Sequence, residues 1–390
     1  MKQYFREYCA GCGLCQDLQF TNLKYENDGF PYPDRCTKEM DKFCDEVCPL
    51  GKNYLSRIKS ENLWGDYEHY YIGFSNDECI RRTASSGGIL TEICSYLIED
   101  DKVDGIVQIK YSEVDPIETI TVVSKTVEEV KSCSGSRYAV SMPLVNIRSI
   151  IEDGKRYAFV GKPCDVAALR NYSKRDAIIS NAIKYYFSFF CAGTPSRVAN
   201  KQMLDVLGCK QNECEYFNYR GNGWPGKVTA IDIHRNSYEM DYYTAWMTVL
   251  GRIIKKSCKF CVDSIGEASD ISCGDYWYLD EKRNPIFKEA DGRNCIFTWN
   301  EFGYELIEEM VQKKRITVLN ENIEDLKYVQ PNHFNRRTTI IYKWLAMKLM
   351  LRQAPRYSIR KMIALAKCNS LKSGFRVFKG SIKRIMQGKI

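Results

Sequence analysis

The spacing of the first cysteines constrains this chain more than any other feature. Cys9, Cys12 and Cys15 are separated by two residues each, and a distant Cys48 is followed by Pro49. A tight loop with this spacing turns three thiolates toward three corners of a 4Fe-4S cubane, and a remote Cys-Pro supplies the fourth ligand. The spacing therefore predicts one 4Fe-4S cluster on these four cysteines.

The surrounding sequence departs from a two-cluster ferredoxin. No Cys-Pro follows closely after Cys15, and Cys36 and Cys44 are separated by seven residues, so both stay unassigned. The alternative is a four-cysteine zinc knuckle, although zinc sites normally pair two Cys-x2-Cys motifs. Residues 1–60 hold too few large apolar side chains for a core of their own. We therefore expect a small ferredoxin-like domain held together by its cluster.

Cysteine usage also indicates a cellular compartment. Eighteen cysteines in 390 residues exceed ordinary usage, but a chain of this length does not need disulfides to fold. No signal-peptide pattern opens the sequence, and no run of 18 uncharged apolar residues occurs. We therefore expect a soluble, cytoplasmic, reduced protein in which clustered cysteines indicate metal or redox chemistry.

A second cysteine set is dispersed along the chain and consists of Cys164, Cys191, Cys258 and Cys261. Cys164 and Cys191 each follow an expected strand. If these strands are neighbours, their carboxyl ends bring both thiols to the ligand-binding edge of an α/β sheet, and the Cys258/Cys261 pair completes four ligands. The alternative is that such cysteines are small apolar fillers. We expect that role for Cys79, Cys94, Cys133, Cys209, Cys214, Cys273, Cys295 and Cys368.

The apolar pattern from residue 67 onward alternates between strand-like runs and helical faces. Strands are expected over 70–74, 105–109, 119–123, 157–160, 184–190, 229–234 and 296–299, and helices over 87–99, 143–153 and 196–207. This alternation predicts an α/β fold with a mixed sheet covered by helices. We place this core at residues 67–330, between the domain of residues 1–60 and a basic tail of residues 336–390.

Charge is divided unequally between the body and the tail. Of 57 Lys and Arg residues, 15 lie in residues 336–390, which contain no Asp or Glu. The first 335 residues therefore hold 42 basic against 49 acidic residues, a net charge of about −7. This division removes overall basicity as an argument for nucleic-acid binding, and we expect no nucleic-acid partner. A zinc-dependent nucleic-acid-binding protein is the alternative class, and it would need zinc at the cysteine triplet.

The tail has two helix-like runs, over 338–352 and 358–367. A basic amphipathic helix with Trp and Leu is attracted to an anionic membrane surface, which suggests peripheral contact with the inner face of the membrane. The alternative is a helix pair that packs on the acidic body of its own chain or of a partner chain.

Nine sequence blocks occur in an order that resembles the coenzyme F420 hydrogenase/dehydrogenase beta-subunit family, which includes plant hydroxymethyl chlorophyll a reductases. The blocks are the triplet at 9–15, NDGFPYP at 27–33, SSGG at 85–88, GSRY at 135–138, GKPC at 161–164, CAGTP at 191–195, RGNGWPG at 220–226, CKFC at 258–261 and DISCGDYW at 270–277. The resemblance covers residues 5–310. It implies an iron-sulfur flavoprotein oxidoreductase, with FAD in the α/β core and a second 4Fe-4S cluster on Cys164, Cys191, Cys258 and Cys261.

The resemblance also implies a function. Electrons would pass between a ferredoxin-type or deazaflavin partner and a small organic substrate through two clusters and FAD. Many bacterial members accompany surface-polysaccharide synthesis genes, which suggests a sugar-derived substrate. The run of glycines at 221–226 has the Gly-x-Gly-x-x-Gly spacing but precedes an expected strand instead of opening a helix, so no Rossmann-type motif is visible and we expect no dedicated NAD domain. The alternative is a non-catalytic electron-transfer subunit of a larger redox complex.

Several blocks have the composition of a flavin site. Ser85, Ser86, Gly87 and Gly88 open an expected helix whose free N–H groups suit a pyrophosphate, although the serines could simply cap the helix. The other candidate FAD contacts are Gly135, Ser136, Arg137, Lys162, Asn222, Gly223 and Trp224. Lys162 is also the sole candidate for a catalytic role, since a cation near flavin N1 and O2 stabilises the reduced ring. Alternatively, Lys162 is a surface lysine.

Overall fold

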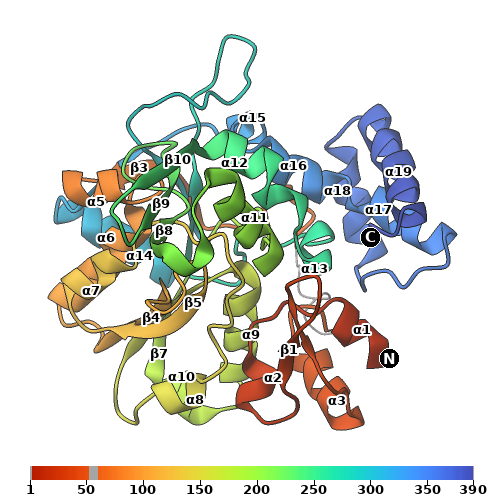
Figure 1. Ribbon diagram of the computed structural model, residues 1–390, viewed down its shortest axis with the longest axis horizontal. Coiled ribbons are helices and arrows are strands. Elements are labelled where there is room, and N and C mark those ends of the chain that lie inside the picture. Colours follow the sequence, from red (N-terminus) through yellow and green to blue (C-terminus); the bar gives the residue numbers. More distant parts are fainter. Residues whose placement is uncertain (1, 52–59, 390) are drawn as a thin grey trace.

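The computed structural model describes residues 2–51 and 60–389, and it is built around an eight-stranded mixed sheet (Figure 1). The strand order is β13-β3-β12-β11-β7-β6-β4-β5. The four adjacent strands β11, β7, β6 and β4 are parallel, and the flanking strands are antiparallel. The strands are β3 (His69–Ser75), β4 (Gly105–Tyr111), β5 (Thr119–Ser124), β6 (Tyr157–Gly161), β7 (Ile183–Phe189), β11 (Ile271–Asp275), β12 (Asn294–Thr298) and β13 (Ile316–Leu319). The predicted mixed α/β core is confirmed.

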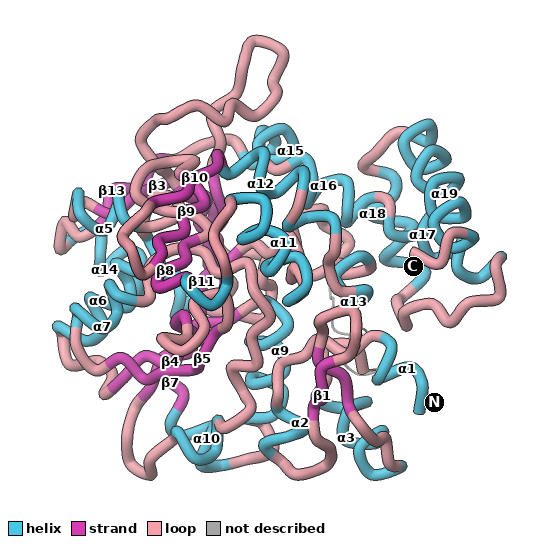
Figure 2. The backbone as a smooth tube through the Cα atoms, in the orientation of Figure 1, coloured by secondary structure: helices cyan, strands magenta, loops and turns pink. Residues whose placement is uncertain are grey.

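Helices cover both faces of this sheet (Figure 2). Side chains alternate along each strand, so Ile106 and Phe187 pack on one face while Val107 and Tyr186 pack on the other. Helices α6 (Ile89–Glu99) and α14 (Glu301–Gln312) cover the first face, and α9 (Pro163–Ser173) and α10 (Ala177–Ala182) cover the second. The central strands are thus buried on both sides, as parallel strands usually are.

Two smaller sheets accompany the main one. The hairpin of β1 (Leu23–Tyr25) and β2 (Pro31–Pro33) belongs to the N-terminal segment. Strands β8 (Cys214–Asn218), β9 (Lys227–Asp232) and β10 (Ser237–Asp241) form an antiparallel sheet with its own apolar cluster. The expected strand over 229–234 therefore exists, but it lies outside the main sheet.

The remaining helices connect these sheets or belong to the tail. They are α1 (Lys2–Glu7), α2 (Leu14–Asp17), α3 (Lys38–Val47), α5 (Glu78–Thr83), α7 (Val127–Ser132), α8 (Ile147–Ile150), α11 (Arg197–Leu207), α12 (Tyr242–Thr248), α13 (Lys256–Lys259), α15 (Leu326–Val329), α16 (Pro331–Thr338), α17 (Ile340–Leu349), α18 (Ile359–Lys367) and α19 (Leu371–Met386). Short 3-10 helices occur at Gln211–Glu213, Leu250–Arg252 and Ile323–Asp325. No helix in the described part of the chain is long and apolar enough to cross a membrane.

The helix expected over 143–153 is wrong in extent, because only Ile147–Ile150 is helical. The preceding backbone is held by the first cysteine loop instead. The Leu144 N–H donates to the carbonyl of Cys12 at 2.9 Å. Val145 packs so closely that a Cβ on Gly13, whose φ is 95°, would lie 2.7 Å from its backbone nitrogen. A contact distant in sequence therefore replaces the first helical turns.

The tail folds back onto the N-terminal segment, beside α1 (Figure 1). Tyr4, Phe5 and Met40 share one apolar cluster with Met347 and Met362 of the tail. The N-terminal segment thus obtains much of its apolar packing from the other end of the chain. The domain expected over residues 1–60 also includes residues 52–59, which lie outside the described residues.

Candidate functional site

The first cysteine set lies around two short helices of the N-terminal segment. Cys9 and Cys12 lie on the loop after α1, Cys15 lies in α2, and Cys48 directly follows α3. Burial raises the pKa of the Cys12 and Cys48 thiols, and repulsion from Cys15 raises both further. The fold therefore brings the four predicted ligands into one another's electrostatic range.

Cys44 is a further member of this neighbourhood. Its Sγ lies 3.7 Å from Sγ of Cys15, and this hydrogen bond lowers the pKa of Cys15 and raises that of Cys44. Cys44 and Cys48 are four residues apart at the end of α3, so one helical turn places both near the set. The four-residue spacing of Cys44 and Cys48 could have indicated from the sequence that Cys44 lies near the predicted ligands. Cys36 is half-buried and packs on the same apolar cluster.

The dispersed cysteines also meet. Strands β6 and β7 are parallel neighbours, which meets the condition stated from the sequence, so Cys164 at the start of α9 and Cys191 after β7 lie at one sheet edge. Burial raises the pKa of Cys191 to about 11, and repulsion from Cys258 contributes. Burial raises the pKa of Cys261, and repulsion from Cys258 and Cys191 raises it further. These four thiols therefore form a second group, assembled from three separate parts of the chain.

Iron-sulfur clusters are held by cysteine thiolates, and each group brings four cysteines close together, so both groups suit such a cluster. Within residues 2–51 and 60–389, no three or more Cys, His, Asp or Glu side chains converge tightly enough to hold a single metal ion.

Lys255 lies between the two cysteine groups. Its Nζ donates to the Pro31 carbonyl at 2.7 Å, and the side chain is buried. Burial lowers the pKa of Lys255, whereas the thiols of Cys9 and Cys258, one from each group, oppose that shift. Ser257, which precedes Cys258 of the second group, joins the two cysteine groups directly, because its Oγ donates to the Cys9 carbonyl at 3.2 Å.

Side chains from the start of the tail bind the loops of the second group. Arg336 donates to the carbonyls of Cys191 and Ala192, at 3.2 and 2.5 Å. Lys343 donates to the carbonyl of Lys259 at 2.9 Å, between Cys258 and Cys261. Sequence reasoning missed these positions, because side-chain donors to distant carbonyls leave no local pattern.

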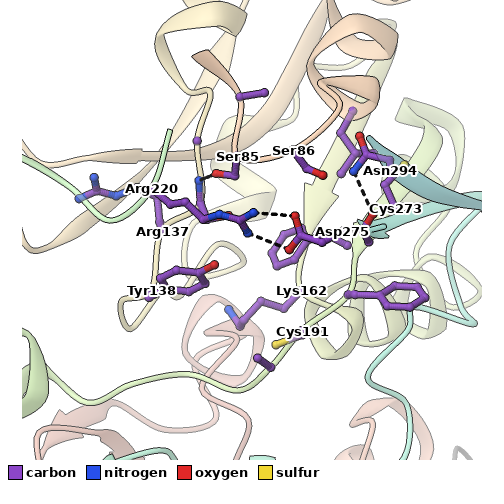
Figure 3. A pocket seen from close by; sticks show the side chains of 18 of the residues that line it. Ser85, Ser86, Arg137, Tyr138, Lys162, Cys191, Arg220, Cys273, Asp275 and Asn294 are labelled. Carbon is purple, nitrogen blue, oxygen red and sulfur yellow. Dashed lines mark hydrogen bonds and ion pairs between the residues drawn. The ribbon is translucent and has the colours of Figure 1, made fainter. Parts of the chain in front are cut away.

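A cavity of about 310 Å³ opens at the carboxyl ends of the parallel strands β6, β7 and β11 (Figure 3). This is the usual ligand-binding edge of an open α/β sheet, and the volume lies within the range of small-molecule sites. Of the candidate FAD contacts, the cavity is lined by Ser85, Ser86, Gly88, Gly135, Ser136, Arg137 and Lys162. Cys191 also lines it, so the cavity adjoins the second cysteine group.

Four candidates do not line the cavity: Gly87, Asn222, Gly223 and Trp224. Gly87 packs against the sheet, where a Cβ would lie 2.8 Å from the Gly73 carbonyl oxygen. Trp224 stacks on Trp277, which does line the cavity, at a centroid distance of 4.7 Å. The 222–224 turn therefore supports the cavity wall from behind.

The serines of the SSGG block do not cap helix α6, contrary to that alternative. Gly88, with φ 79°, is the N-cap residue of α6. Ser86 Oγ donates to the Arg293 carbonyl at 2.8 Å, and Ser85 Oγ accepts from the Ser136 N–H. The Ser85–Ser136 contact joins two of the sequence blocks at the cavity wall.

The cavity wall also contains an ion pair of a buried arginine and a partly buried aspartate that sequence reasoning missed. Arg220, 1% exposed, binds Asp275 through two parallel hydrogen bonds of 2.7 and 2.8 Å. Its Nε donates to the Pro225 carbonyl, and Trp224 Nε1 donates to Asp275 at 3.2 Å. Both charged residues line the cavity. They lay within recognised blocks, but nothing local indicated their pairing.

Lys162 is buried, so the surface-lysine alternative is wrong. Its Nζ lies 2.7 Å from Asp165 and donates to Ser141 Oγ at 2.6 Å. Burial alone would lower the pKa of Lys162, but attraction to Asp165 and to the Cys164 thiol raises it overall. Lys162 is therefore a fixed cation between the second cysteine group and the cavity.

Arg137 already has two partners, the carbonyls of Phe217 and Pro116, at 2.6 and 2.5 Å. Its Nε is buried without a hydrogen-bond partner. Arg137 lines the cavity, and buried donors normally have a hydrogen-bond partner, so its unsatisfied Nε–H suits a polar ligand.

His333 is a further residue of the cavity wall that sequence reasoning missed. Its Nδ1 lies 2.8 Å from Ser264 Oγ. Burial, with nearby Arg336 and Arg337, lowers the pKa of His333 to about 3. The ring is therefore neutral at physiological pH.

Comparison with known proteins gives consistent matches over most of the core. Two family models of the coenzyme F420 hydrogenase/dehydrogenase beta subunit match, the N-terminal one over residues 70–148 and the C-terminal one over residues 154–324. The coenzyme F420-dependent sulfite reductase of Methanocaldococcus jannaschii is 24% identical over 84% of this chain. This chain spans 50% of the length of that reductase.

Two further proteins agree. The coenzyme F420 hydrogenase subunit beta of Methanococcus voltae is 26% identical, over 68% of this chain and 88% of its own length. One protein chain in the structure of the F420-reducing NiFe hydrogenase complex from Methanosarcina barkeri has a TM-score of 0.54 at 18% identity. The match covers 73% of this chain and 94% of that chain, which shows a shared fold.

Proposed function

We propose, from the premise that this chain belongs to the coenzyme F420 hydrogenase/dehydrogenase beta-subunit family, that it is an iron-sulfur flavoprotein oxidoreductase. An electron-transfer redox role follows from the relatives, which include an F420-dependent sulfite reductase and an F420 hydrogenase subunit. The finer proposal is that the chain carries two 4Fe-4S clusters and FAD and acts on a small organic molecule.

One observation carries this proposal: Cys191 belongs both to the second thiol group and to the cavity wall. A group held by those thiols would adjoin a ligand in the cavity. The first thiol group is joined to the second through Ser257 and Lys255. In this proposal the two thiol groups and the cavity serve as three adjoining sites, as electron transfer between a protein partner and a substrate would require.

In this proposal Cys9, Cys12, Cys15 and Cys48 hold one cluster, and Cys164, Cys191, Cys258 and Cys261 hold the other. The cavity holds FAD, for which the unsatisfied donor at Arg137 Nε is a candidate contact. The clusters supply one-electron transfer, and FAD supplies exchange between one-electron and two-electron chemistry.

In this proposal the residues that line the cavity bind and orient its ligand. Lys162 lies at the cavity wall beside Cys191, where its pair with Asp165 at 2.7 Å fixes its position and balances its charge. Arg220 and Asp275 neutralise each other, so they shape the wall without adding net charge. Aromatic rings at Tyr242 and Trp277 line the same cavity and suit stacking on a flat ring.

We propose a ferredoxin-type protein or a deazaflavin as the redox partner, and a sugar-derived small molecule of surface-polysaccharide synthesis as the substrate. The relatives named above depend on or belong with F420, which favours the deazaflavin. In this proposal the enzyme works on the cytoplasmic side of the membrane.

Anaerobic redox titration tests the function. Protein purified without oxygen is mixed with reduced F420 or with reduced ferredoxin, and its visible absorption is followed. We expect one of these donors to bleach it, and C368A, which alters an exposed tail cysteine, to behave as wild type. Failure of both donors to reduce the protein would overturn the proposal.

The alternative is a non-catalytic electron-transfer subunit. Oxidation of the reduced chain by nucleotide-linked sugars, with a stoichiometric reduced product, is the expected result for the enzyme. If the reduced chain gives up its electrons only to a second protein, the non-catalytic alternative is correct.

A further inference from the structure

The 15 cations of the tail divide into two groups by exposure. Five are partly or fully buried: Arg336, Arg337, Lys343, Arg356 and Lys361. Ten are exposed: Lys348, Arg352, Arg360, Lys367, Lys372, Arg376, Lys379, Lys383, Arg384 and Lys389. Packing of the tail on its own body, one of the two alternatives from the sequence, can account only for the first group.

The inward cations do have partners on the body. Arg337 binds Glu267 and the Val262 carbonyl, at 2.6 and 2.7 Å. Arg356 pairs with Asp45 at 2.6 Å. With the contacts of Arg336 and Lys343 to the second cysteine group, these bonds fix the inner side of the tail.

The ten exposed cations of the tail have few ion-pair partners on the body. Within residues 2–51 and 60–389, only Arg360 of the ten forms an ion pair, with Glu61, and both partners are exposed. The tail contains no Asp or Glu of its own. Apart from Glu61 beside Arg360, the solvent side of the tail therefore presents a strong positive field without a paired counter-charge among the described residues.

Large apolar side chains are also exposed along the tail. Eight of the 18 exposed large hydrophobic residues among the described residues lie in the tail: Leu345, Leu349, Leu351, Ile359, Ile363, Leu371, Phe375 and Met386. Three pairs are four residues apart and so share a helix face, one pair on each of α17, α18 and α19. Lys379 Nζ lies 4.7 Å from the ring centre of Phe375, so cation and apolar group adjoin.

We propose that these ten cations and eight apolar side chains form an outer tail surface that docks on an anionic lipid bilayer. Aliphatic and aromatic side chains enter the interface between headgroups and acyl chains, while Lys and Arg bind lipid phosphates. Anionic lipid fits better than an acidic protein. Seven of the eight apolar side chains are spread over three helices and Leu351 follows α17, and lipid acyl chains can accommodate each without a complementary protein surface.

Figure 1 shows the tail helices α17, α18 and α19 together at one end of the molecule, beside the N-terminal segment and away from most of the main sheet. Docking through the outer tail surface would therefore leave the sheet side of the molecule directed away from the membrane. This inference does not depend on the identity of the substrate or on the proposed cofactors.

Vesicle sedimentation of the full chain, purified without oxygen, tests the proposal. Vesicles are made of phosphatidylcholine alone or of phosphatidylcholine with a quarter phosphatidylglycerol. We expect binding to the anionic vesicles only, weakened by salt because surface charges are screened. The variant K372Q/R376Q/K379Q/K383Q should lower the partition coefficient by about tenfold or more. The variant L371S/F375S should weaken binding at every salt concentration.

Matched controls keep the result tied to this surface. The variants K184Q and I233S alter an exposed lysine and an exposed apolar residue of the body and should bind as wild type. Each variant should keep the wild-type melting temperature. Absence of wild-type binding, equal binding to both vesicle types, or unchanged binding of the fourfold variant would overturn the proposal. Binding to an acidic ferredoxin but not to vesicles would overturn it as well.

Discussion

The two cysteine groups reach similar chemistry by different routes. In the first, Cys9, Cys12 and Cys15 follow one another in a single loop. In the second, Cys164 and Cys191 come from separate strand ends and meet only because β6 and β7 are parallel neighbours. The first group depends on local spacing and the second on the fold. Substitutions that disturb the sheet or its loops should therefore affect the second group more.

The surroundings of the groups differ as well. The first group packs on apolar side chains contributed by the tail. The second is bordered by fixed cations, with Lys162 on the cavity side and Arg336 on the tail side. Arg336, whose charge opposes the burial that raises the pKa of Cys191, therefore stabilises a negative group at the second site. Four predictions, from the largest expected effect to the smallest, test the two cysteine groups and the cavity wall that adjoins the second.

The largest effect is expected from removing one ligand of each group. C12A and C191A should each lose one cluster and retain about four iron atoms per chain. C12A should keep its flavin, whereas C191A should lose flavin as well, because Cys191 lines the cavity. Iron and flavin quantitation after anaerobic purification measures both. Equal flavin loss in the two variants would contradict the separation of the groups, and C368A is the control.

Removing the buried cation of the cavity wall should destabilise the core. In R220M, Asp275 loses a bidentate partner in a buried setting, so the free energy of unfolding should fall by ~3–5 kcal/mol. The control is R283M, which breaks an exposed ion pair with Asp325 and should cost under ~1 kcal/mol. Urea unfolding compares the two. A cost for R220M no larger than that for R283M would show that the pair is not structural.

Acid should destabilise the region around His333. The folded-state pKa of His333 is about 3, against an ordinary value of 6.5, so the unfolded chain binds one more proton between these values. The free energy of unfolding should therefore fall as pH is lowered through this window, by up to ~1.4 kcal/mol per pH unit from this group.

Variants of His333 and its partner separate this effect from acid titration elsewhere. H333N should flatten the slope between pH 6.5 and 5. S264A removes the partner hydroxyl but keeps the titrating ring, so it should lower stability without changing the slope. If wild type and H333N gave parallel pH profiles, the buried neutral state of His333 would be refuted.

The smallest effect concerns the cation on the tail side of the second group. R336Q removes a positive charge that contacts the Cys191 carbonyl. The reduced state of a cluster there should become less favourable, by up to about tenfold in the equilibrium ratio, or ~59 mV for one electron. Potentiometric titration with electron paramagnetic resonance measures this shift. An unchanged potential with intact iron content would show that Arg336 has only a structural role, and K348Q, an exposed tail lysine, is the control.

The sequence predicted what depends on local spacing. The strands that carry the second cysteine group and the helix over 87–99 appear close to their expected positions. Strand β11 was missed because Ile271–Asp275 contains small and polar residues instead of an apolar run, although it is buried between two neighbours. The helix over 143–153 was overextended, because the Leu144 N–H donates to the distant Cys12 carbonyl.

At the candidate site, too, the residues within short sequence blocks could be predicted, whereas their long-range partners could not. Ser85, Gly135 and Lys162 could be selected from short blocks, and they line the cavity. The partners that fix the site are long-range. Arg220 pairs with Asp275, 55 residues away, and Arg336 reaches Cys191 across 145 residues. Pairings of this kind depend on the packing of finished elements, which periodicity and motif spacing do not encode.

Cofactor analysis of the protein purified without oxygen tests the central claim most directly. Iron, acid-labile sulfide and flavin are quantified per chain, together with zinc. We expect about eight iron atoms, about eight sulfides and one FAD. About four iron atoms, a zinc content that replaces iron, or a protein without releasable flavin would contradict the proposed function.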